Sequence, residues 1–458
     1  MPVTMRRRLA VCALALGLSG AAGMTAYLAA QSAAEQAFAQ AVERLRAALP
    51  PDVVLEHGAV TADPVSGRIT VANVAFGPRD QPGERLRAPQ MLLEGIRPQG
   101  GGVGLLTASN IAITVTERGA THQPVTLASL RIAGLVLPEA GQDFDPGQIR
   151  FDALEAAGIG INPIVEGDDP RGGIGRIALA DIGGDRPDRI EIEGVDLRLP
   201  DLFVGDRLVL GRLSAENLRV LRLLLTLAAG DMPAPPAGVA RLSLEGLAVT
   251  QGDTPVFRLG RFATEGEAVG GDANRLRGTL TAEGFDMAVP PEVGPFSLGY
   301  QRIQAALALA VETELASGDY NVGQFRLALQ DVGTIEFSSR MTGLGTSADP
   351  MRDARLHGFT FRYTDSGLVA RALAEGAQQS GMRAEELREQ IGQMSPMVFS
   401  GPRAEPNVQA LRGFLANPTS LTVTAAPAAP VDLNELEREV SRAPDAASRL
   451  LNITVTSP

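Results

Sequence analysis

Apolar and polar residues alternate along much of this chain, and the alternation changes phase at single glycines or asparagines. In the segment 189–200, apolar residues occupy Ile190 and Ile192, and after Gly194 they occupy Val195 and Leu197. Alternation indicates a half-buried β-strand, because successive side chains of a strand point to opposite faces. A change of phase would turn the next apolar residue to the wrong face unless an extra residue is absorbed, as in a β-bulge. The segment therefore predicts a bent strand.

The same pattern recurs along the chain. Each time, a glycine or asparagine precedes apolar residues at the first and third following positions, and these two residue types best tolerate the positive φ of a bulge. The pattern predicts structural bulge pivots at nine residues: Asn73, Asn110, Gly134, Gly158, Gly194, Asn217, Gly246, Gly284 and Gly358.

Strands predominate between positions 53 and 341. The turn Asp63–Gly67 predicts a hairpin between the first two strands. Long helical patterns are missing here, so the sequence favours antiparallel strands over parallel βαβ crossovers. Leu218–Leu227 reads as a strand followed by a helix. The predicted strands are Val53–Ala62, Arg68–Phe76, Met91–Ile96, Ser109–Thr116, Thr126–Leu137, Phe151–Ile161, Ile174–Leu179, Arg189–Leu199, Arg207–Leu213, Asn217–Leu227, Ala240–Thr250, Phe257–Glu265, Leu276–Val289, Gln304–Glu314, Tyr320–Leu329 and Thr334–Met341.

The chain changes character at Asp365. Asp365 and Ser366 are an N-cap signal, and the residues that follow are rich in Ala, Leu and Glu. The pattern predicts helices over Leu368–Gln379, Ala384–Gln393, Val408–Leu415 and Leu433–Val440, and strands over Ser420–Ala425 and Leu450–Thr456.

The N-terminus predicts a membrane anchor. Arg6, Arg7 and Arg8 precede Leu9–Ala30, an uncharged span long enough to cross a bilayer as a helix. The arginines favour a cytoplasmic N-terminus, with the bulk of the chain on the other side of the membrane. We expect the anchor to stay uncleaved. The alternative is a signal peptide cut among the small residues Ala29–Ala34.

These patterns together predict a mainly β protein with α additions: a transmembrane helix, a long repetitive antiparallel sheet that is bulged and curved into a groove or a sandwich, and a small α/β C-terminal part. Ser32–Leu49 is an amphipathic helix that packs on the first strands or forms a stalk or lid. The predicted divisions are a basic N-terminus at 1–8, the anchor at 9–30, a helix at 31–50, β regions at 51–231 and 239–364 around a Pro-rich linker at 232–238, a helical segment at 365–418 and a strand-helix-strand at 419–458.

Composition and charge exclude several functions. A formal net charge of -12 argues against nucleic-acid binding, which needs a basic patch. The single cysteine, Cys12, rules out an intramolecular disulfide and a thiolate metal cluster. His57, His122 and His357 are far apart in the sequence and lack neighbours at metal-ligand spacing, and no GxSxG elbow is present. We therefore predict no enzyme, and no catalytic, cofactor-binding or metal-binding residues.

The remaining candidate is the apolar face of the sheet. If the sheet closes or forms a sandwich, this face is an ordinary core, and the helical unit Leu368–Gln393 becomes a docking surface for a protein partner. If the sheet curls into an open gutter, the face can hold acyl chains, because each buried methylene contributes about 0.8 kcal/mol.

The order of these features resembles a known family. An N-terminal Arg cluster, one membrane helix, an Ala-rich helix, the hairpin at Asp63–Gly67 and the Gly- or Asn-pivoted strands are similar to the AsmA-like and YdgA-like envelope proteins of Gram-negative bacteria. These are relatives of TamB and of the bridge-like lipid-transfer architecture. Ala354–Gln393 and Asn417–Pro430 resemble C-terminal parts of the YdgA-like group. The resemblance implies an inner-membrane-anchored periplasmic protein of envelope homeostasis or phospholipid traffic, with no catalytic residues.

Overall fold

The fold is seen in a computed structural model of the whole chain. It describes residues 31–40, 42–43, 46, 52–81, 85–97, 102–117, 120–136, 150–162, 171–183, 186–199, 205–219, 238–269, 274–289, 298–344, 352–443 and 445–458. The predicted anchor, the linker at 232–238 except for Gly238, and most of Leu218–Leu227 lie outside these ranges. Among the described residues, no helix combines the length and the apolar character needed to cross a membrane.

The chain is mainly β and forms two compact units. Unit 1 comprises 1–200 and 218–233, and unit 2 comprises 201–217 and 234–458. This division differs from the predicted boundary at 232–238, because the strand over Arg207–Glu216 pairs with the strand over Ala240–Gln251.

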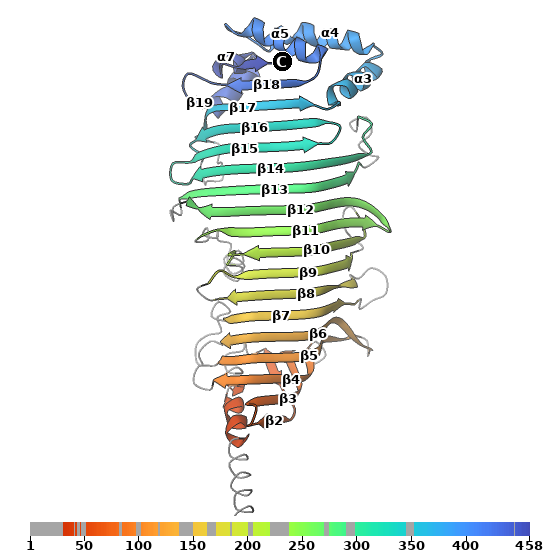
Figure 1. The fold of residues 1–458 in the computed structure, drawn as a ribbon, viewed down its shortest axis with the longest axis vertical. Helices are drawn as coiled ribbons and strands as arrows, with labels where there is room; N and C mark the ends of the chain where they lie inside the picture. Colours follow the sequence, from red (N-terminus) through yellow and green to blue (C-terminus); the bar gives the residue numbers. More distant parts are fainter. Residues whose placement is uncertain are drawn as a thin grey trace, which may run out of the picture. The chain divides into compact units, whose positions relative to one another are not determined.

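Unit 1 is an antiparallel meander in which, from β2 onward, each strand pairs with its sequence neighbours (Figure 1). Its strands are β1 (Val53–Glu56), β2 (Val60–Asp63), β3 (Arg68–Pro78), β4 (Leu86–Arg97), β5 (Gly102–Glu117), β6 (Ala120–Val136), β7 (Phe151–Ile161), β8 (Arg171–Ile182) and β9 (Arg189–Arg198). The predicted single strand Val53–Ala62 is wrong. It divides into β1 and β2, which pair with different parts of β3, because the chain bends at Gly58 opposite Asn73.

Unit 2 is also an antiparallel meander, and it ends in helices (Figure 1). Its strands are β10 (Arg207–Glu216), β11 (Ala240–Gln251), β12 (Thr254–Ala268), β13 (Arg275–Ala288), β14 (Arg302–Glu314), β15 (Asp319–Leu329), β16 (Gly333–Thr342), β17 (Arg355–Asp365), β18 (Ser420–Ala425), β19 (Val431–Asp432) and β20 (Thr454–Thr456). Its helices are α3 (Leu368–Ser380), α4 (Ala384–Met394), η4 (Ser395–Met397), α5 (Ala404–Ala416), α6 (Leu433–Arg442) and α7 (Ala446–Leu450).

The predicted C-terminal elements occur in the predicted order, and the bounds of two of them differ clearly from the structure. α5 begins four residues before the predicted Val408, with Pro406 inside its first turn, where a missing N–H costs nothing. The predicted strand Leu450–Thr456 is wrong at its start, because Leu450 ends α7 and only the last three of these residues form β20.

Among the described residues, two clusters of buried side chains form the core. In unit 1, the helical residues 31–40 and 42–43, called here the N-terminal helix, place Phe38 and Val42 on β2 to β6. In unit 2, β17, β18 and β20 pack with residues of the C-terminal helices around Leu356, Ala425 and Val455.

Candidate functional site

The candidate site is one face of the sheet in each unit, and its geometry begins with the pivots. Eight of the nine predicted pivots have positive φ, between 50° and 67°. Gly358 is the exception and does not adopt a positive φ, although the pairing register of β16 and β17 shifts beside it.

In unit 1 the pivots do not act as ordinary bulges. Gly158 lies opposite Ala128, and the pairs Ser129–Ala157 and Leu127–Ile159 on either side have the same register. One residue on each strand is therefore left out of the pairing at the same place. Neither strand has an extra residue relative to its neighbour. The predicted extra residue on one strand is wrong here, because the adjacent strand changes phase at the same place.

The skipped residues form continuous rows across the strands. The first kink row follows β3 to β9 through Asn73, Pro89, Asn110, Ala128, Gly158, Gly175 and Gly194. The second kink row crosses β4 to β8 six positions away, through Gly95, Gly104, Gly134, Asp152 and Asp181. Positive φ values occur on every second strand of each row.

Most residues of the first kink row are small because backbones approach closely there. A Cβ atom on Gly175 would lie 3.1 Å from the carbonyl oxygen of Glu193, and one on Gly158 would lie 2.8 Å from the Cβ of Ala128. The sequence pattern missed Gly95 and Asp181, since neither is followed by apolar residues at both expected positions. The spacing could have located them, because Gly95 lies six residues after Pro89 and Asp181 lies six residues after Gly175.

Unit 2 contains a shorter kink row and then true bulges. Gly211, Gly246, Gly260 and Gly284 lie opposite one another on β10 to β13. At Gly284 the register between β13 and β14 shifts by one residue, so this pivot is a bulge as predicted. Further register shifts lie beside Gly323 and Gly358.

The shared change of phase keeps apolar residues opposite apolar residues. In unit 1 the cross-strand pairs Leu179–Ile190, Ile177–Ile192 and Ile174–Val195 continue through the first kink row without interruption. In unit 2 two unbroken apolar lines cross the strands. One runs through Leu280, Leu309, Phe325, Phe337, Phe361, Val423 and Val455, and the other through Phe262, Ala282, Leu307, Leu327, Ile335, Tyr363 and Leu421. We call this surface the apolar face of each unit.

The apolar face is covered only in part. Below the N-terminal helix, Val71 and Ile111 are 0% and 3% exposed. On β7 to β9 of unit 1 and β11 to β16 of unit 2 most members are only half-buried. Within the described ranges, the close backbone contacts of these strands are with neighbouring strands, and the two clusters of buried side chains include no residue of β7 to β9 or of β11 to β15.

The opposite face is charged. Arg176 of β8 forms ion pairs of 2.8, 3.4 and 3.6 Å with Glu155, Glu191 and Glu193 of the adjacent strands. The hydrogen bond from its guanidinium to Glu155 raises the pKa of Arg176 above its usual range. In unit 2, Arg241 is paired with Glu265 in the same way. Each sheet therefore has one apolar and one ionic surface, which is the pattern of a sheet with one face in water.

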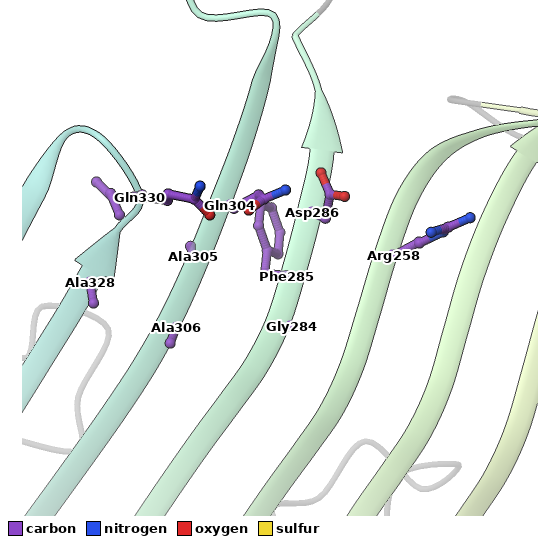
Figure 2. A pocket seen from close by; sticks show the side chains of 10 residues that line it. Arg258, Gly284, Phe285, Asp286, Gln304, Ala305, Ala306, Ala328 and Gln330 are labelled. Atoms are coloured by element: carbon purple, nitrogen blue, oxygen red, sulfur yellow. The ribbon is translucent and has the colours of Figure 1, made fainter.

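A hollow of about 520 Å³ lies where Gly284, Ala306 and Ala328 line up across β13 to β15 (Figure 2). Arg258, Gln304 and Gln330 also line it, and Asp286 at its edge is held 2.8 Å from Nε of Arg302. The hollow is lined by no histidine, cysteine, serine or threonine, so its described lining offers no nucleophile with a neighbouring base.

The histidines do not converge. His57 packs edge-on to Phe38 with ring centroids 5.5 Å apart, and Nε2 of His357 lies 3.0 Å from the Thr342 hydroxyl. The side chain of His122 lies outside the described structure. Among the described residues, no three His, Cys, Asp or Glu side chains are grouped so as to hold a metal ion.

Comparison with known proteins adds one finding. A family model described as an uncharacterized protein matches residues 326–458, which contain β16 to β20 and the C-terminal helices. Neither the curated proteins nor the solved structures gave a match. The resemblance to AsmA-like and YdgA-like proteins therefore stays a prediction.

Proposed function

We propose that this chain is a non-enzymatic protein anchored in the bacterial inner membrane by one N-terminal helix, with its bulk in the periplasm. Its apolar face forms a groove that binds the acyl chains of phospholipid or another acyl ligand. The role of such a protein is envelope homeostasis, through lipid binding and transfer or through outer-membrane assembly.

One observation carries the proposal: a continuous apolar face without a covering layer in the described structure. Large apolar patches on water-soluble surfaces mark binding sites or cause aggregation. An alkyl chain lying across the strands would shield Leu307, Leu309 and Phe325 of unit 2 from water. Each methylene removed from water contributes about 0.8 kcal/mol, so an acyl chain of ~10 carbons gains several kcal/mol even when half covered.

Native mass spectrometry of the full chain, released from membranes in detergent, tests this proposal. The informative variant is Leu309→Glu, which places a charge on the apolar face of β14. The matched control is Ala308→Glu, the adjacent residue on the opposite face, where the new carboxylate lies across from Arg326. We expect co-purified lipid with the native chain and the control and a clear loss with Leu309→Glu. A folded native chain free of lipid would contradict the proposal.

A second candidate function is a partner-binding envelope module with a C-terminal docking surface. It is favoured by four exposed apolar side chains at the junction of α4 and η4, with exposed fractions of 37% to 70%: Ile391, Met394, Met397 and Val398. Capture from solubilised envelopes would test it with Met394→Asp and Met397→Asp combined, and with Gln390→Asp of the same helix as control. Loss of a captured protein with unchanged lipid content would favour this module. Unchanged capture would exclude the junction as its docking surface.

A further inference from the structure

The N-terminal helix occupies the same apolar face that is uncovered farther along unit 1. Phe38 and Val42 are 4% and 7% exposed, and they share one buried cluster with Ile69, Val71 and Ile111. Leu127 and Leu130 of β6 are only partly buried and pack at the margin of this cluster. The covered part of the face therefore ends near β6.

The face itself does not end there. Leu127 pairs with Ile159 of β7, and Leu130 pairs with Ala156, so the same surface continues into β7 to β9. The register and the kink rows are the same in the covered and uncovered parts. The change from covered to uncovered surface thus depends on where the helix lies and not on a change in the strands.

The helix is attached mainly through one side. Phe38 packs against the cluster and against His57, while its neighbours Ala39 and Gln40 are exposed. Farther along the chain, Nε of the helical residue Arg46 donates a 3.1 Å hydrogen bond to the carbonyl of Leu55 on β1. A small set of apolar contacts therefore holds the helix over the first strands.

We propose that the N-terminal helix is an end stop for the ligand-binding face of unit 1. Phe38 and Val42 occupy the surface that an acyl chain would otherwise take on β2 to β6, so ligand binds from β7 onward. This inference rests on the proposed lipid-binding function. Phe38 sets the limit of the ligand-binding surface, because the Phe38 ring and an alkyl chain compete for contact with the same apolar side chains.

Site-specific photo-crosslinking tests the stop on the full chain. Benzoylphenylalanine is placed either at Met91 of β4, in the covered cluster, or at Ile177 of β8, in the uncovered part. The protein is reconstituted with vesicles of phosphatidylethanolamine and phosphatidylglycerol that contain fluorescent phosphatidylethanolamine. After irradiation, fluorescence on the protein band reports lipid at each position.

In the native background we expect an adduct at Ile177 and none at Met91. Phe38→Asp cannot keep its side chain in an apolar cluster, so the helix detaches and the Met91 adduct rises to the level at Ile177. Ala39→Asp carries the same charge on the exposed side of the helix and leaves the native pattern. Phe38→Ala is a milder second variant, which decides the matter if Phe38→Asp abolishes both adducts by unfolding unit 1.

Two results overturn the stop. One is a native Met91 adduct as strong as that at Ile177. The other is a Met91 position that stays unlabelled in Phe38→Ala while Ile177 remains labelled. A native chain labelled at neither position is a different failure, because it contradicts lipid binding itself.

Discussion

At the scale of single residues, the fold depends on side chains that accept an unusual backbone conformation within strands. Gly194 has φ of 65°, and Asn73 and Asn110 take up 50° and 51° in the same kink row. Most L-residues pay roughly 1–2 kcal/mol in this left-handed region, and only Gly, Asn and Asp enter it readily. Conformation therefore limits residue choice at these pivots, in addition to the close packing at Gly158.

Substitution at Gly194 separates these two causes. A Cβ atom there would have its nearest contacts 3.6 Å away at Gly175, which is an ordinary van der Waals distance. We expect Gly194→Val to lower the free energy of unfolding by about 1–2 kcal/mol, and Gly194→Asn to lower it much less. Urea unfolding of the two variants measures the difference. Equal losses would show that space, and not φ, limits this position.

Tyr363 predicts a pH dependence at the start of the helical segment. Its hydroxyl lies 2.7 Å from Oδ1 of Asp365 and 2.8 Å from the carbonyl of Val332, and Asp365 also accepts the N–H groups of Gly367 and Val369. Burial, followed by the hydrogen bond to Asp365 and its charge, raises the pKa of Tyr363 well above its ordinary value.

The unfolded chain therefore loses this proton first as the pH rises above about 10, and the stability of the folded chain falls there. We expect Tyr363→Phe to cost about 1 kcal/mol near neutral pH through the lost hydrogen bond. The same variant should flatten the alkaline loss of stability. Denaturant unfolding at a series of pH values up to ~11 checks both effects. An alkaline slope identical to that of the native chain would refute the assignment.

At the scale of elements, unit 2 protects the last strand of its sheet with a helix. Asn407 of α5 is 1% exposed, donates to the carbonyl of Ile453 at 2.9 Å and accepts the N–H of Val455 at 2.8 Å. The amide thus satisfies backbone groups that an open sheet edge would leave ready to pair with another chain.

Removing this amide should have two effects. Asn407→Ala leaves two buried backbone groups without their partner, and each costs roughly 1–3 kcal/mol. We also expect more aggregation on heating, because the edge of β20 is exposed. Gln409→Ala, on the exposed side of the same helix, is the control. Thermal unfolding with light scattering measures both effects, and identical behaviour of the two variants would contradict this role.

The elements also show what could be predicted from the sequence. Alternation located the strands, and the N-cap signal and Gly381 located α3 and its end, because these depend on local side-chain chemistry. The paired kinks were not predictable from Gly158 alone, because their register depends on Ala128 on a neighbouring strand. α7 was missed because Ala446–Leu450 is too short for a helical period to stand out from a strand.

At the scale of the whole molecule, the apolar face is a feature that both units have. In unit 1 the uncovered part is aliphatic, with Ile174, Ile177 and Ile192, whereas in unit 2 it includes Phe262, Phe325 and Phe337. Both parts face away from an ionic surface formed by arginine and glutamate. The same physical property is therefore built twice from different side chains.

If each unit binds acyl chains by itself, the losses caused by charges on the two faces should add. We expect Ile177→Glu to remove the lipid held by unit 1 and Leu309→Glu to remove that held by unit 2, with the double variant losing the sum. Distant sites without shared partners behave additively, whereas sites that share one ligand do not. Native mass spectrometry counts the lipids in each variant. Complete loss of lipid from either single variant would contradict independent binding by the two units.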